Sequence, residues 1–126
     1  MNEDDLGVLV DRFYARVRRD DLLGPLFNRA VDDWPHHLET LRAFWSSVML
    51  TSGRYKGSPM AAHLRHASAI RGEMFDRWLE LWRETAFATL AEPNATAVVA
   101  KAERIGESLK LALFFRIEAG AGRKAA

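Results

Sequence analysis

The chain has 126 residues, a formal net charge of +1 and no cysteine, with 48% hydrophobic and 28% charged residues. This length and composition are those of one soluble domain that can bury a sizeable core. The small net charge argues against nucleic-acid binding, and the lack of cysteine excludes disulfides, thiolate catalysis and cysteine-ligated metals. The acidic N-terminus does not resemble a signal peptide, and no apolar run of about 18 residues occurs, so we expect a cytoplasmic protein without membrane spans.

The first predicted helix covers residues 4–19. Val10, Phe13 and Val17 recur at helical spacing and predict one buried face. Tyr14 lies beside this face. Two interpretations stay open for it: a boundary tyrosine with its hydroxyl in water, or a hydroxyl that points into an internal pocket.

Two adjacent histidines stand in the second long helix, predicted over residues 34–50 and preceded by a connector over 20–33 that carries a short helix. The helical phase places His37 on the apolar side, whereas His36 points toward solvent. A single histidine on an apolar face is more often a hydrogen-bonded core residue than a ligand, so both interpretations of His37 stay open here.

The remaining segments follow in this order: a loop over 51–58, a short helix over 59–66, long helices over 73–91 and 94–117, and a flexible tail over 118–126. His63 and His66 share one face of the short helix because they are three residues apart. Trp78 and Trp82 lie one turn apart on the third long helix. No apolar alternation with a period of two occurs, so we expect a single all-α domain over residues 1–126.

The common catalytic motifs are absent from the sequence. We find no phosphate-binding loop, no dinucleotide fingerprint, no zinc-protease helix and no nucleophile elbow, and the carboxylates lie mainly on predicted solvent faces. What remains is one or two inward histidines among aromatic side chains: Tyr14, Phe27, Phe44, Phe75 and Trp78. A haem needs an axial imidazole and flat apolar walls, so the pattern suits either a haem site or an ordinary core.

Several stretches, in this order, resemble the truncated haemoglobins of the third group. They are FYARVRRDDLLGPLFNRAV, WPHHL with FWS downstream, YKGSPMAAHL and FDRWLELW, and they fall within about residues 10–90. The Gly-Gly pairs that other truncated groups carry at helix ends are absent, as is typical of the third group. The resemblance implies a compact globin fold in which two antiparallel helix pairs, two over two, enclose haem b.

The resemblance also implies roles for individual residues. His63, in a Y-x-G-x-P-x-x-x-H pattern, corresponds to the proximal iron ligand. Tyr14 and Trp78 correspond to distal hydrogen-bond donors, and His37 to a distal histidine that swings between open and closed positions; we expect these three to act in catalysis. The expected haem contacts are Phe27, Leu41, Phe44, Met60, His63, Phe75 and Trp78. His66 departs from the family pattern, and of the two roles open to it, a propionate contact or a surface residue, we favour the surface.

This resemblance implies a function in gas-ligand chemistry. Two distal donors slow the release of O2, which favours O2, NO or peroxide redox chemistry, such as NO dioxygenase or peroxidase-like activity, with an unidentified external reductase. The expected ligands are O2, NO and CO, and the expected assembly is a monomer or weak dimer. Three alternatives stay open: an oxygen-binding or gas-sensing globin without turnover, a haem-free helical interaction module, and a resting form in which His37 binds iron directly.

Overall fold

The computed structural model describes the backbone of residues 1–125 and the side chains of residues 1–114. Helices account for every regular element over this range, as the sequence predicts. Their bounds are α1 Glu3–Val17, α2 Gly24–Ala30, α3 Trp34–Leu50, α4 Pro59–Leu64, the short 3-10 helix η1 Ala67–Ala69, α5 Gly72–Thr89 and α6 Glu92–Ala125.

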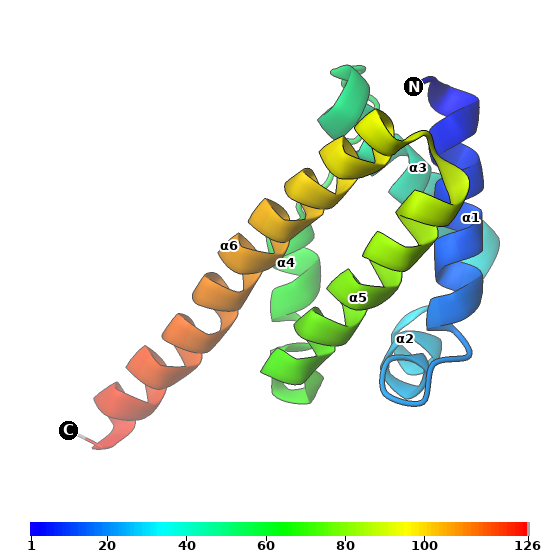
Figure 1. The fold of residues 1–126 in the computed structure, drawn as a ribbon. Coiled ribbons are helices and arrows are strands. Elements are labelled where there is room, and N and C mark those ends of the chain that lie inside the picture. The colour runs from blue at the N-terminus through cyan, green and yellow to red at the C-terminus, as the bar shows by residue number, and fades with distance from the viewer. Residues whose placement is uncertain (126) are drawn as a thin grey trace.

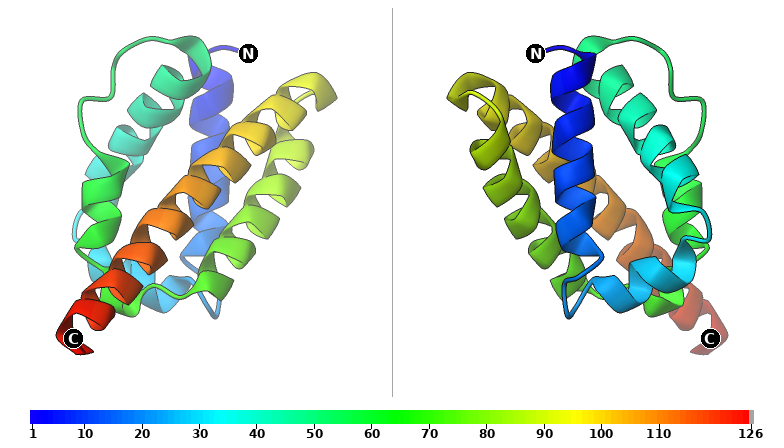
Figure 2. Two further views of the ribbon diagram at one scale, coloured as in Figure 1. Left: turned by 90° about the vertical axis from the view of Figure 1, so that its left-hand side faces the viewer. Right: turned by 90° about the vertical axis from the view of Figure 1, so that its right-hand side faces the viewer.

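Two antiparallel helix pairs form the body of the molecule. Helices α1 and α3 make one pair, and α5 and α6 make the other (Figures 1 and 2). Helix α1 also packs against α5, which joins the pairs, while α4 packs against α6. The predicted two-over-two arrangement is therefore confirmed. A loop over residues 51–58 runs from the end of α3 to the start of α4 (Figure 2).

Side-chain caps begin α1, α3 and α4, which carry Tyr14, His37 and His63. Asn2 and Asp5 form a capping box at the start of α1. Asp33 accepts from a backbone N–H in the first turn of α3 at 3.1 Å, and Ser58 does the same for α4 at 3.2 Å. Both α3 and α4 also have proline in the first turn, where no N–H is needed. The local sequence thus sets where these three helices begin, and with it the directions of His37 and His63.

The core lies between the two helix pairs. The predicted buried face of α1 is confirmed, since Val10, Phe13 and Val17 are each 0% exposed. They meet the aromatic side chains Trp45 of α3 and Trp82 of α5 in one hydrophobic cluster. Burial of such large aromatic rings dominates the stabilisation of a domain of this size.

Two helices end at other residues than the sequence predicts. The short helix predicted over 59–66 stops at Leu64, and η1 follows as a separate turn. Helix α6 continues to Ala125, beyond the predicted end at residue 117. The side chains from residue 115 onward and residue 126 lie outside the described residues, so the predicted flexibility of the tail over 118–126 stays a prediction.

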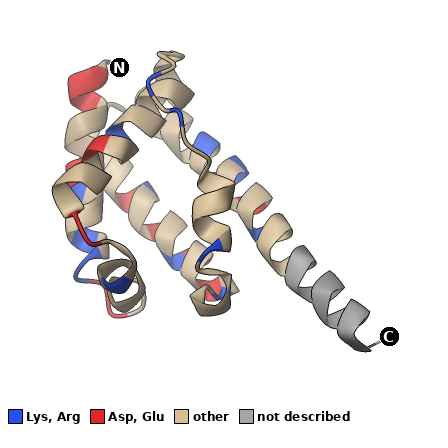
Figure 3. Ribbon diagram, turned by 180° about the vertical axis from the view of Figure 1, so that it is seen from behind, with Lys and Arg blue, Asp and Glu red and all other residues tan. Residues whose placement is uncertain are grey.

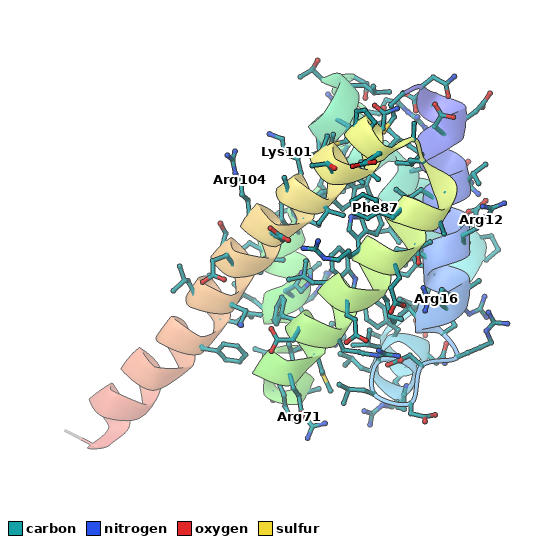
Figure 4. The ribbon with its side chains drawn as sticks, viewed as in Figure 1. Arg12, Arg16, Arg71, Phe87, Lys101 and Arg104 are labelled. Atoms are coloured by element: carbon teal, nitrogen blue, oxygen red, sulfur yellow. The ribbon has the colours of Figure 1, made fainter. Side chains whose placement is uncertain are left out.

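Charged residues of both signs are interspersed along the helices (Figure 3). Arg12 on α1 and Lys101 and Arg104 on α6 point away from the core (Figure 4), whereas Arg16 reaches across to Glu84 and Thr85 of α5. Within residues 1–125, no helix has both the length and the apolarity that crossing a membrane requires.

Candidate functional site

A cavity of about 590 Å³ lies between the helices, which is within the usual size range of small-molecule and cofactor sites. Every long helix contributes to its wall, together with α2, α4 and the loop over 51–58. Most of its lining is apolar. The cavity brings together nearly all the predicted site residues: Tyr14, Phe27, His37, Leu41, Phe44, His63, Phe75 and Trp78.

Met60 is the predicted cofactor contact that does not line this cavity. It packs instead against a cluster formed by Phe75, Leu109 and Leu113. Phe75 and Leu109 of that cluster themselves line the cavity, so a contact of Met60 with the cofactor stays a prediction.

His63 has a fixed ring orientation. Its Nδ1 lies 2.7 Å from the carbonyl oxygen of Pro59, one turn earlier in α4. A carbonyl oxygen can only accept, so Nδ1 carries the hydrogen and Nε2 keeps its lone pair. The Phe75 ring lies nearly parallel to the imidazole, with the two ring centroids 6.3 Å apart at 24°. This is the arrangement of an imidazole held ready to bind a metal through Nε2.

Tyr14 lines the cavity and is only 3% exposed, so the boundary-tyrosine interpretation is wrong. Burial raises the pKa of its phenol well above the usual value, and the Trp78 side chain partly opposes this rise. The phenol is therefore protonated at neutral pH and can donate a hydrogen bond. Phe13 packs edge-on against both Tyr14 and Trp78, with ring centroids 4.7 Å and 5.0 Å away, and holds the two rings on the same side of the core.

The prediction that His37 lies on the apolar side of its helix and His36 points toward solvent is confirmed. His36 is exposed, whereas His37 is half-buried and lines the cavity. Burial, and secondarily the charge of His36, lowers the pKa of His37, so its imidazole is mainly neutral at pH 7. The His37 ring lies 6.3 Å from that of Tyr14 and 5.6 Å from that of Trp34, edge-on to each.

Sequence reasoning missed a group of cations at the mouth of the cavity. Arg54, Lys56 and Arg65 line the cavity and are exposed to solvent, and none of the described lining residues is acidic. The signal was present in the sequence as two cations flanking Tyr55 in the loop before α4. A mouth of this composition attracts carboxylate groups, while the interior accepts an apolar ring system.

The loop over 51–58 is tied to the body by polar contacts. Glu3 of α1 accepts from the buried hydroxyl of Ser46 and forms an ion pair with Arg54. The backbone N–H of Tyr55 donates to the hydroxyl of Ser47 at 2.8 Å. These contacts hold the cationic mouth in place beside α4.

A second space of about 310 Å³ adjoins the first and shares Phe27, His37 and His63 with it. His36 and the exposed His66 also line it, so all four histidines of the chain border this space. Among the described residues, no three histidine or carboxylate side chains gather closely enough to hold a bare metal ion.

Comparison with known proteins finds the same architecture in a globin. The fold matches the crystal structure of a group III truncated haemoglobin from Campylobacter jejuni with a TM-score of 0.82 and 29% identity, over 90% of this chain and 91% of that one. The group 3 truncated hemoglobin ctb of Campylobacter jejuni subsp. jejuni serotype O:2 is 29% identical over 118 residues, which cover 90% of this chain and 92% of the relative. The chain is thus similar in sequence and in fold to group III truncated haemoglobins. No family model matches it.

The likeness to these haemoglobins points to haem as the cofactor to consider, and the residues of the cavity fit it. The cavity offers an imidazole whose tautomer leaves Nε2 free, as the hydrogen bond from His63 to Pro59 fixes. It offers aromatic walls, of which Phe75 lies nearly parallel to that imidazole. Its mouth carries cations that suit the two propionate carboxylates of a haem.

Proposed function

We propose that this chain binds haem b in the 590 Å³ cavity, where Nε2 of His63 would hold the iron. The observation that carries the proposal is the 2.7 Å hydrogen bond from Nδ1 of His63 to the carbonyl oxygen of Pro59. That bond orients the ring and increases the basicity of the opposite nitrogen. His66 is exposed and stays outside the proposed site.

The walls and the mouth of the cavity hold the rest of the cofactor. Phe27, Leu41, Phe44 and Phe75 supply flat or branched apolar contacts. Their burial excludes water from the ring system and stabilises binding by about 25 cal/mol for each Å² of apolar surface removed from water. The cations at the mouth keep the carboxylates of the cofactor at the solvent edge.

Tyr14 and Trp78 are the proposed donors to a ligand in the cavity. When bound, haem supplies an iron atom that takes a diatomic gas at its open position and that can change its redox state. The Tyr14 O–H would donate to the ligand, and the Trp78 N–H, which interacts with the Tyr14 phenol, would turn to it as a second donor; each would contribute on the order of 1 kcal/mol or more in a dry pocket. The neutral imidazole of His37 can accept or donate a hydrogen bond on the side of the cavity where Tyr14 lies.

The activity that this arrangement favours is redox chemistry of O2, NO or peroxide, such as oxidation of NO to nitrate. Two donors toward one ligand slow its release, which suits a protein that transforms O2 better than one that delivers it. Turnover of this kind requires electrons, which the proposal assigns to a separate reductase. The same slow release also favours the second candidate, an oxygen-binding or gas-sensing globin without turnover.

Two measurements test the proposal. Purified protein supplemented with haem is expected to show a Soret absorption band. A protein that binds no haem and shows no such band after titration with haem would contradict the haem hypothesis. Steady consumption of NO by the haem-loaded protein with a reductase and its nicotinamide donor then separates the two candidates. Sustained turnover supports the redox function, whereas a single stoichiometric reaction supports binding without turnover.

We also infer a cytoplasmic protein that is a monomer or a weak dimer. Among the described residues, the large exposed hydrophobic side chains are Val8, Phe87 and Leu111, which lie on three different helices. Phe87 points outward from α5 (Figure 4). Single exposed apolar residues of this kind do not make the extended apolar patch of a permanent interface. Sedimentation velocity at several protein concentrations tests this inference.

A further inference from the structure

The start of α3 meets the end of α1 at an aromatic contact outside the cavity. The half-buried Trp34 is the first residue of α3 and lines neither the 590 Å³ cavity nor the second space. Its ring centroid is 6.2 Å from that of Tyr14 and 5.6 Å from that of His37. Trp34 therefore contacts two of the proposed site residues without bordering the site itself.

The geometry of the helix places the His37 imidazole on this indole. A side chain in an α-helix leans toward the helix N-terminus and covers the residue three or four positions earlier. Trp34 is three positions before His37, and the two rings meet edge-on at 85°. The imidazole also meets the Tyr14 ring edge-on at 83°, with 6.3 Å between centroids. The three rings thus form one cluster, in which the imidazole contacts an indole of its own helix and a phenol of α1.

Arg18 lies over the Trp34 ring, with its guanidinium carbon 4.5 Å from the ring centroid. Arg18 follows Tyr14 by one helical turn, and its backbone N–H donates to the Tyr14 carbonyl oxygen at 3.0 Å. Its own carbonyl oxygen accepts from the side chain of Asn28 at 3.1 Å. No carboxylate of the described residues forms an ion pair with Arg18. The cation–π contact with Trp34 therefore orients the guanidinium and links the end of α1 to the start of α3.

The His37 imidazole has a second place to which it can turn. His37 borders both the cavity and the second space, whose wall carries the carboxylates of Asp32 and Asp33. No hydrogen bond to a described residue holds the imidazole where it lies. A half-buried imidazole without such a bond gains hydrogen bonds to water by turning toward solvent. Packing against Trp34 is therefore the contact that keeps the ring beside Tyr14.

We propose that Arg18 and Trp34 are positioning residues, which together hold the His37 imidazole beside Tyr14 and away from the second space. The indole supplies the surface against which the imidazole packs, and the guanidinium keeps the indole in place. In this position His37 separates the two spaces, so a small ligand that enters through the second space must displace the imidazole. The inference rests on the proposed function, because it requires a ligand that binds in the cavity.

The charges near His37 decide the conditions of the test. The titratable and charged groups that border the second space, or that pack on the pair of His37 and Trp34, are Tyr14, Arg18, Asp32, Asp33, His36, His63, Arg65 and His66. A protonated His37 would be attracted by the two carboxylates of the second space and repelled by Arg18. The measurements are therefore made at about pH 8, where the imidazole is neutral and its position reports on packing.

Packing alone also joins aromatic rings, so the variants must separate the position of His37 from the stability of the fold. Trp34→Ala removes the surface on which the imidazole lies. Trp34→Phe is the conservative variant, which keeps an aromatic face for both neighbours. Arg18→Met keeps the length of the side chain without the guanidinium, and Arg19→Met, at the next exposed position outside this cluster, is its matched control. Far-UV circular dichroism and the Soret band report on fold and haem loading.

The experiment uses the haem-loaded protein under carbon monoxide. The first readout is the nuclear Overhauser cross-peaks between the ring protons of His37 and Tyr14, and the second is the rate of CO association after flash photolysis. We expect strong cross-peaks in the wild type, in Trp34→Phe and in Arg19→Met. Trp34→Ala is expected to show several-fold weaker cross-peaks and several-fold faster CO association, and Arg18→Met a smaller change of the same sign.

Unchanged cross-peaks in Trp34→Ala would overturn the inference even with faster CO association, because the ligand would then enter by another route. Equal behaviour of Arg18→Met and Arg19→Met would also overturn it, since the guanidinium would have no part in the arrangement. If Trp34→Ala does not fold, this pair of exposed-site variants decides the question. A protein without a Soret band would contradict the proposed function, whereas a loaded protein whose His37 stays in place in these variants would contradict only this inference.

Discussion

Replacement of Tyr14 by phenylalanine tests the proposed distal donor. The change removes one oxygen and leaves the ring, which packs 4.7 Å from Phe13 and 5.9 Å from Phe27 between centroids. Because Tyr14 is 3% exposed in a mainly apolar cavity, water cannot replace the lost hydrogen bond efficiently. A hydrogen bond to an acceptor that carries negative charge contributes about 1.5–3 kcal/mol. Tyr14→Phe is therefore expected to speed O2 dissociation by about 10- to 150-fold.

Stopped-flow measurement of O2 dissociation from the ferrous haem-loaded protein gives this rate directly. Carbon monoxide serves as an internal control, because it accumulates less negative charge than O2 and gains less from a donor. We expect its dissociation from Tyr14→Phe to change much less. An O2 dissociation rate within about twofold of wild type, below about 0.4 kcal/mol, would remove Tyr14 from the ligand network. Equal acceleration for both gases would indicate an opened pocket in place of a lost hydrogen bond.

Three further predictions concern stability. Trp82→Ala removes a fully buried ring and is expected to lower the free energy of unfolding by about 3–5 kcal/mol in urea titration, and a loss below about 1 kcal/mol would contradict the packing described. Burial raises the pKa of Asp20, but hydrogen bonds from Arg77 and two backbone N–H groups outweigh it and lower the net pKa. The stabilisation by ionised Asp20 is therefore present above its unfolded-state pKa of about 4 and is lost as the pH falls through its folded-state pKa. Asp20→Asn is expected to flatten the decline of the free energy of unfolding in urea at acid pH. A parallel decline in both proteins would refute the assignment. Gly24→Ala places a methyl group 2.9 Å from a backbone carbonyl oxygen and is expected to destabilise, whereas Gly7→Ala, with only a side chain 3.7 Å away, is expected to stabilise by about 0.5–1 kcal/mol; thermal denaturation that ranks them in the reverse order would contradict both contacts.

Helix positions and directions could be predicted from the sequence because they depend on local chemistry. The phase of the second long helix separated His37 from His36 correctly, and that helix begins at Trp34 as predicted. The same reasoning left Tyr14 undecided, since a residue beside an apolar stripe faces either solvent or a second partner. The neighbouring helices α3 and α5 cover Tyr14 and so bury its side chain. The helical periodicity of α1 contains no information about where α3 and α5 lie.

The remaining features depend on contacts between distant segments. Met60 packs against Phe75 of α5 and Leu109 of α6, a contact that the spacing within α4 does not specify. The contact of Trp45 with Trp82 requires these two positions of α3 and α5 to lie side by side. The spacing of residues along either helix does not specify this alignment. Two of the mouth cations, Arg54 and Lys56, lie in a loop without regular structure, and the direction of Arg54 follows from its ion pair with Glu3.

The claim on which the proposed function depends is that His63 binds the haem iron. The most direct measurement is the absorption spectrum of His63→Ala and of His66→Ala after titration with haem, with His66→Ala as the matched control three residues away and exposed to solvent. We expect His66→Ala to retain a wild-type Soret band and stoichiometric loading, and His63→Ala to lose the band or to show a broad spectrum of disordered haem. A wild-type spectrum from His63→Ala, together with a loss in His66→Ala, would contradict the assignment of the axial ligand.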